Sequence, residues 1–149
     1  MELRLGLNTF HPGEFVLWDD IAPDAVPLVG DSLADAAAAA AAALVCADPE
    51  HALRQGVRAD RIIVDAGVAP PVAKVEECLS SGHAVLVTLR GAGDAADPGL
   101  LAAASVYAWL GVRVFRAEVR DQGPVRQVLD MVASIKGTRP PALSRRGLT

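Results

Sequence analysis

The stretch that decides the fold is RIIVDAG, at residues 61–67. Three consecutive apolar residues precede Asp65, as in a strand that is buried on both faces and presents one polar side chain at its end. In parallel α/β sheets and barrels, the carboxyl ends of the strands form the ligand-binding face. Asp65 is therefore a candidate binding residue. The alternative is a carboxylate that caps a helix or closes a loop.

Strand-like and helix-like segments alternate from residue 61 to residue 136. Apolar runs that end at polar residues or glycine are typical of strands, and proline before a segment with glycine after it is typical of helices. The pattern predicts strands at residues 62–65, 84–89 and 112–116 and helices at residues 72–81, 98–110 and 122–136. The repeat of about 30 residues matches a βαβ unit, whose strands are parallel, so we expect an α/β fold.

The segment before residue 61 contains more strand-like runs than crossover helices. It predicts strands at residues 3–8, 15–18 and 26–30, and helices at residues 50–55 and from residue 33 through the alanines. Asn8 ends the first predicted strand, and Asp19 follows the second. The connection between these two strands is too short for a crossover helix, so either a helix has been lost or the pair is not parallel.

Composition indicates one domain and argues against several classes of partner. The chain has 149 residues, enough for one buried core, and its net charge of −4 gives no basic field for nucleic acid. Cys46 and Cys78 do not form a zinc or disulfide pattern, and no apolar run reaches membrane-spanning length. We therefore expect a cytoplasmic α/β domain at residues 1–137, followed by a flexible basic tail at residues 138–149.

Three charged residues are expected to meet at one end of the predicted sheet. Asp65, Arg90 and Arg116 each stand at the carboxyl end of a predicted strand. The carboxylate can accept N–H donors of a flat heterocycle while a guanidinium stacks on the ring or binds an anion. The alternative is a salt bridge that closes the end of the sheet. Gly91 and Gly93 either let backbone amides approach an anion or form a flexible loop.

Four segments carry a resemblance to a known family: ADRIIVDAG, AVLVTLRG, LLAAASVYAWLGVRVFRAEV and VRQVLDMVASIKG. Their order and spacing resemble the C-terminal half of dihydropteroate synthase, a TIM barrel of the pterin-binding superfamily. The resemblance implies that Asp65 matches the pterin-binding Asp of the family's Asp-Pro-Gly strand end. It also implies that Arg116 matches the Arg of the family's last strand, which ends in Arg-x-His and binds pterin and phosphate.

Two upstream segments extend the resemblance. WDDI at residues 18–21 is similar to the family's Asn-Asp-Ile strand end, and LGLNT at residues 5–9 is similar to its Val-Asp-Thr strand end. The resemblance then implies secondary pterin contacts from Asp19 and Asn8. The two residue types are exchanged relative to the family, but both side chains can bond a pterin edge.

The chain departs from the family pattern at positions that serve catalysis. The family's Ser-Arg-Lys, whose lysine holds pterin, is here Leu89-Arg90-Gly91, so we expect Arg90 to substitute only in part. Glu118 stands where the family has histidine, and its negative charge would repel a pyrophosphate. The family's N-terminal loops, which bind pyrophosphate, metal and aminobenzoate, have no counterpart.

Length limits the architecture, because a closed (β/α)₈ barrel takes about 200 to 250 residues. We therefore expect an incomplete TIM-type barrel or an open parallel sheet flanked by helices, whose open edge favours a homodimer or a complex with a complete homologue. The preferred interpretation is a degenerate pterin- or anion-binding or regulatory subunit linked to folate metabolism. One alternative is an active synthase that joins a dihydropterin pyrophosphate to 4-aminobenzoate with Mg²⁺. Another is an interaction module without a ligand.

Overall fold

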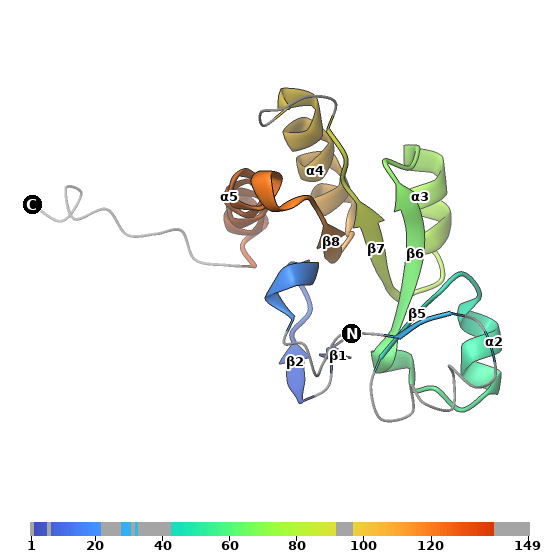
Figure 1. The fold of residues 1–149 in the computed structure, drawn as a ribbon. Coiled ribbons are helices and arrows are strands. Elements are labelled where there is room, and N and C mark those ends of the chain that lie inside the picture. The colour runs from blue at the N-terminus through green and yellow to red at the C-terminus, as the bar shows by residue number, and fades with distance from the viewer. Residues whose placement is uncertain are drawn as a thin grey trace, which may run out of the picture.

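The computed structural model describes residues 2–5, 7–21, 28–30, 32, 43–91 and 97–138. Its central feature is a six-stranded sheet in the order β3-β8-β7-β6-β5-β4. Figure 1 shows the four strands β5 to β8 of this sheet. The strands are β3 (Val16–Leu17), β4 (Leu28–Val29), β5 (Leu44–Cys46), β6 (Ile62–Val68), β7 (Ala84–Thr88) and β8 (Val114–Arg116). Each neighbouring pair in this sheet is parallel, which confirms the predicted α/β class with a parallel sheet.

The order of the strands is that of a barrel with one opening. Strands β4 to β8 follow one another in chain order, and β3, which precedes them all, pairs with β8. In a closed (β/α) barrel the first strand pairs with both the second and the last. In the described part of the chain, β3 and β4 are instead the two edges, so the sheet is open.

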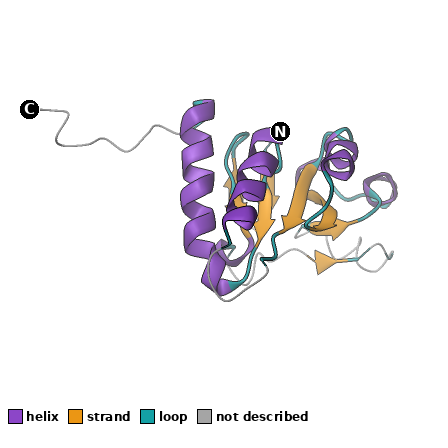
Figure 2. Cartoon of the chain, turned by 90° about the horizontal axis from the view of Figure 1, so that it is seen from above, coloured by secondary structure: helices purple, strands orange, loops and turns teal. Residues whose placement is uncertain are grey.

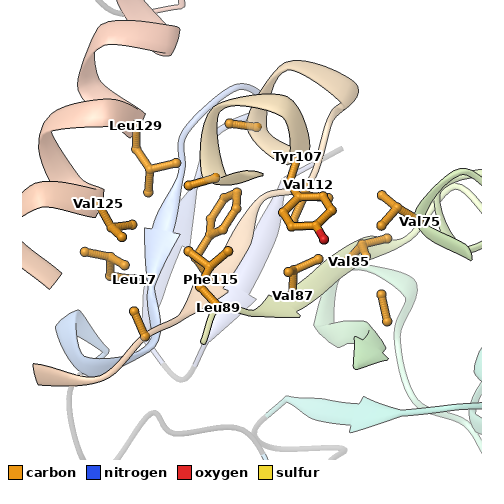
Figure 3. Close-up of a cluster of buried hydrophobic side chains, with 14 of the residues drawn as sticks. Leu17, Val75, Val85, Val87, Leu89, Tyr107, Val112, Phe115, Val125 and Leu129 are labelled. Atoms are coloured by element: carbon orange, nitrogen blue, oxygen red, sulfur yellow. The ribbon is translucent and has the colours of Figure 1, made fainter. Parts of the chain in front are cut away.

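The helices lie on one face of the sheet. They are α2 (Pro49–Arg54), α3 (Val72–Leu79), α4 (Pro98–Leu110) and α5 (Val119–Lys136). Phe115 is fully buried in the core beneath them, and its ring meets Phe15 edge to face with the centroids 6.1 Å apart. Figure 3 shows this core, to which α3, α4 and α5 contribute Val75, Tyr107, Val125 and Leu129. Helices α4 and α5 run side by side (Figure 2).

An antiparallel hairpin packs on the opposite face, which we call the inner face. Its strands are β1 (Leu3–Leu5) and β2 (Asn8–Phe10). The buried side chains of Leu3 and Leu5 join an apolar cluster with Ile63 and Leu86 of the sheet. The prediction of one strand at residues 3–8 is therefore wrong: the apolar alternation continues through a turn, which leaves Leu7 exposed.

The hairpin is also tied to the sheet by Arg113, which precedes β8. Its Nη2 donates to the carbonyl oxygens of Phe10 and His11 at 3.1 and 2.8 Å. Burial lowers the pKa of Arg113 from its ordinary value, because the guanidinium loses contact with water. Strand β1 in addition contacts the 3₁₀ turn η3 (Ala59–Arg61), which precedes β6. The hairpin is thus held at the amino ends of the parallel strands.

Most predicted elements after residue 43 match the structure to within a few residues. Helix α5 is the exception, because it begins at Val119 rather than at the expected glycine-proline pair, and Pro124 lies inside it. Proline favours the first helical position but does not always mark it. Residues 33–42 of the predicted alanine-rich helix, Gly93 and residues 139–149 of the predicted tail lie outside the described residues. The expected continuation of that helix to residue 47 is wrong, because residues 44–46 form the buried strand β5. Among the helices that are described, none has the length and apolar character needed to span a membrane.

Candidate functional site

Polar side chains occupy the carboxyl end of the inner face. Side chains alternate along each strand, so Asp65 shares the face of Ile63, and Arg116 shares the face of Val114. Asp65 is paired in register with Leu86, whose other partner is Val114. The inner face is therefore apolar toward the hairpin and polar toward the strand ends. Because β6 and β8 are two strands apart and Arg116 stands two residues beyond the row of Asp65, the two residues lie on the same face with backbones about 12 Å apart.

Asp65 makes a local contact that fixes its orientation. Its Oδ1 accepts a hydrogen bond from the amide of Gly67 at 2.8 Å, and Gly67 adopts a φ of +98° that favours glycine. The pairing of β6 with β7 shifts register after Asp65, where this turn bends the strand. The exposed carboxylate borders a cavity of about 260 Å³ that Gly30 and Cys46 also line. Asp65 therefore closes the loop after β6, which was the alternative considered from the sequence, and it also borders a cavity at the strand ends.

Arg116 is engaged by an aromatic ring of this chain. Its Cζ lies 4.1 Å from the centre of the Trp18 ring, a cation–π contact. Trp18 begins the 3₁₀ turn η1 (Trp18–Asp20) directly after β3, and the pairing of Leu17 with Phe115 brings it beside Arg116. No ion pair joins Asp65 and Arg116 in the described part of the chain, so the salt bridge considered above is not formed. Sequence reasoning missed Trp18, although an aromatic residue directly after a buried strand was a usable signal.

The two acidic residues of η1 bind helix α5. Asp19 accepts a hydrogen bond from Nε2 of Gln122. Asp20 forms an ion pair with Arg126 at 2.8 Å. These contacts fasten the turn that carries Trp18 onto the start of α5. The predicted pterin contact of Asp19 stays a prediction, and its carboxylate already has a partner.

The start of α5 carries negative charge. Glu118 forms an ion pair with Nε of Arg120 at 3.4 Å. The Oδ2 atom of Asp121, which is 1% exposed, lies 3.8 Å from the same nitrogen. A helix amino end attracts anions through its backbone dipoles, but two carboxylates already stand there. This end of α5 is therefore poorly suited to a pyrophosphate.

The loop after β7 is explained in part by packing. A Cβ atom on Gly91 would lie 3.3 Å from the side chains of both Asp97 and Leu100, so glycine lets the loop approach α4 closely. Asp97 caps α4 by accepting from the amide of Gly99 at 2.8 Å, which uses a donor that an anion would need. Arg90 is exposed at the end of β7. Anion binding by Arg90, Gly91 and Gly93 stays a prediction.

Asn8 lies in a different setting from the other candidates. It is the exposed first residue of β2, and its hairpin forms a separate antiparallel sheet. Its expected place at the end of the first predicted strand is therefore wrong, and its pterin contact stays a prediction. The cause is the turn before it, which the alternating sequence concealed.

A larger cavity lies on the helix-covered side of the molecule. It has a volume of about 530 Å³ between the segment that leads into β3 and helix α5. Phe10, Phe15 and Leu129 give it apolar walls, and Asp20 and Arg126 lie at its border. It does not include Asp65 or Arg116, so the candidates from sequence do not point to it.

Comparison with known proteins decides the relationship that the sequence suggested. Inactive dihydropteroate synthase 2 of Mycobacterium leprae is 36% identical over 124 residues, which cover 70% of this chain and 42% of that protein. This chain is homologous to dihydropteroate synthase-like proteins. The Mycobacterium tuberculosis protein of the same name is 50% identical over 50 residues, which cover 34% of this chain and 15% of that protein. No family model matches the chain.

A solved structure agrees with this relationship. The structure of Mycobacterium tuberculosis Rv1207 matches with a TM-score of 0.51 and 28% identity, over 67% of this chain and 52% of that one. The dihydropteroate synthase-like chain thus spans less than half the length of the Mycobacterium leprae relative and about half of the solved chain. Its parallel sheet and helices correspond to part of a larger α/β protein.

The dihydropteroate synthase-like chain lacks the lysine that the resemblance places after β7. Its lysines are Lys74 on α3, which pairs with Glu77 at 3.8 Å, and Lys136 at the end of α5. Neither follows β7, where the resemblance would place one. Within the described ranges, no three His, Cys, Asp or Glu side chains gather as metal ligands. Because Mg²⁺ needs several oxygen ligands, these residues do not fit a magnesium site held by the protein alone.

Proposed function

We propose that this chain is a degenerate dihydropteroate synthase-like protein, linked to folate metabolism, that binds a planar pterin-like ring without transferring it. The observation that carries the proposal is the position of Asp65 and Arg116. They lie on one face and at one end of a parallel sheet, where α/β proteins bind ligands. The names of the relatives support the degenerate character.

Asp65 is the proposed anchor for the ring. One carboxylate oxygen is held by the Gly67 amide, so the carboxylate presents its other oxygen in a fixed direction. A carboxylate that accepts ring N–H donors forms charge-assisted hydrogen bonds, which are about twice as strong as neutral ones. The cavity beside Asp65, of about 260 Å³, has apolar walls that include Val29 and Val45. Arg116 is the proposed secondary contact, through stacking or attraction of an anionic group.

Loss of catalysis follows from the charges around the strand ends. Displacement of pyrophosphate needs positive groups or a metal to stabilise the leaving anion. The carboxylates of Glu118 and Asp121 stand instead at the start of α5, and Arg120 is the cation between them. We therefore expect no pyrophosphate release from dihydropterin pyrophosphate and 4-aminobenzoate, even at high protein concentration.

The test is a calorimetric titration of the chain with pterin. Asp65→Asn keeps an acceptor for the Gly67 amide but removes the charge, and we expect it to weaken binding about 10- to 100-fold. Asp60→Asn is the matched control, because Asp60 precedes the opposite end of the same strand and pairs with Arg58 at 3.2 Å. Absence of heat at millimolar pterin, or equal affinities for wild type and Asp65→Asn, would refute the proposal.

A further inference from the structure

The contact between Trp18 and Arg116 has a consequence for ligand binding at the inner face. We propose that the Trp18 ring occupies the stacking position on Arg116 that a planar ligand would take, so that the chain limits its own affinity. The inference rests on the proposed function, because it concerns the same end of the sheet. It adds a residue, Trp18, that competes with the ligand.

The first step of the argument is geometric. Guanidinium groups stack on flat rings, and the Cζ of Arg116 lies 4.1 Å from the centre of the Trp18 ring. This is the contact that a planar heterocycle would make with the same side chain. A ligand that stacks on this face of Arg116 must therefore displace Trp18.

The second step is that Trp18 is held in place. The indole is half-buried and packs against the apolar cluster of the inner face, which includes Val16 and Ile21. The turn that carries it is fastened to α5 through Asp19 and Asp20. Displacement of the ring therefore breaks the cation–π contact and also disturbs an anchored turn. Trp18 accordingly opposes ligand binding instead of yielding freely.

The expected effect of removing the ring is a gain in affinity. Leucine at position 18 keeps an apolar side chain on the cluster but cannot stack on Arg116. We expect Trp18→Leu to bind pterin about 3- to 30-fold more tightly than wild type, which corresponds to the usual strength of a cation–π contact. Trp18→Met, whose flexible side chain fills irregular space, carries the same expectation if the leucine variant does not fold.

The experiment is a calorimetric titration of pterin into wild type, Trp18→Leu, Trp18→Met and Asp65→Asn. Tighter binding to the folded position-18 variants supports the inference. Equal or weaker binding to them, with Asp65→Asn still impaired, overturns the inference and leaves the proposed function standing. Absence of binding to every variant overturns both.

A spectroscopic measurement tests the contact independently of affinity. Trp109 on α4 is the other tryptophan, so Trp109→Phe leaves Trp18 as the single indole fluorophore. We expect bound pterin to increase the quenching of Trp18 by acrylamide, because the displaced ring becomes more exposed. Unchanged acrylamide quenching in a chain saturated with pterin would show that the ring stays on Arg116, and would overturn the inference.

Discussion

At the scale of single residues, Tyr107 shows how a buried polar group is satisfied in this fold. Its ring lies in the core under the helices, and its hydroxyl donates to the carbonyl oxygen of Pro70 at 2.6 Å. Burial raises the pKa of Tyr107 above its ordinary value of 10.0, because the phenolate would lose its hydration. The hydroxyl thus links α4 to the loop that follows the strand of Asp65.

Tyr107→Phe should lower the free energy of unfolding by about 1 to 3 kcal/mol at pH 8, since the Pro70 carbonyl loses its donor. The folded pKa of Tyr107 lies above the unfolded one, so its contribution is complete below pH 10 and is lost as pH rises beyond that. Urea unfolding at pH 8 and pH 10.5 should therefore show a smaller alkaline loss in the variant. Burial also raises the pKa of Cys78, so its titration adds the same alkaline loss of stability to the wild type and to Tyr107→Phe. Equal losses would contradict this account.

The sequence predicted the position of Asp65 but not the partner of Arg116. A strand of three buried residues followed by a carboxylate defines its own carboxyl end, so local pattern was sufficient. The contact of Arg116 with Trp18 depends on the pairing of β3 with β8, which are about 100 residues apart in the chain. Sequence periodicity carries no information about such a pairing, and the identity of the aromatic partner therefore came from the structure.

At the scale of elements, helix α5 contains a glycine directly before its internal proline, Pro124. A Cβ atom on Gly123 would meet nothing within 4 Å apart from its chain neighbours, but the ring of a following proline disfavours the helical conformation of a residue that carries a Cβ. The two effects oppose each other, so Gly123→Ala should change the free energy of unfolding by less than about 0.5 kcal/mol. Gly67→Ala is the contrasting variant, because a φ of +98° strains any other residue, and it should destabilise. Chemical denaturation measures both, and stabilisation by both substitutions would contradict the assigned backbone.

The hairpin is the element for which pattern reasoning failed, and it offers a direct check. Leu5→Ala should lower the free energy of unfolding by about 2 to 5 kcal/mol, because the Leu5 side chain is fully buried in the inner-face cluster. Leu7→Ala should change stability by less than about 0.5 kcal/mol, because Leu7 is 99% exposed. The comparison uses the same substitution two residues apart. Similar costs at the two positions would mean that the predicted single strand was correct after all.

Elements with strong boundary signals were predicted well. Helix α4 matches its predicted range, because Asp97 and Pro98 define its start and Gly111 its end. The hairpin lacks such a signal in an alternating segment, and Pro124 gave a misleading one inside α5. Capping residues, proline and glycine therefore predicted the ends of an element correctly only where the tertiary structure used those same residues as its ends.

At the scale of the whole molecule, the edges of the sheet bear on the expected partner. The two edge strands of the described sheet, β3 and β4, have two residues each. Very short edge strands are one way in which proteins limit pairing with other chains. The expected homodimer or complex with a complete homologue stays a prediction.

The arrangement of the whole sheet places an apolar layer at the amino ends and polar groups at the carboxyl ends of one face. The measurement that tests this account most directly is an amide-detected NMR titration of the ¹⁵N-labelled chain with pterin. We expect the largest shift changes at the carboxyl ends of the strands, in Asp65–Gly67 of β6, at Arg90 after β7 and at Arg116 of β8. Changes confined to the hairpin and the amino ends of the strands, or no change at millimolar pterin, would contradict the account.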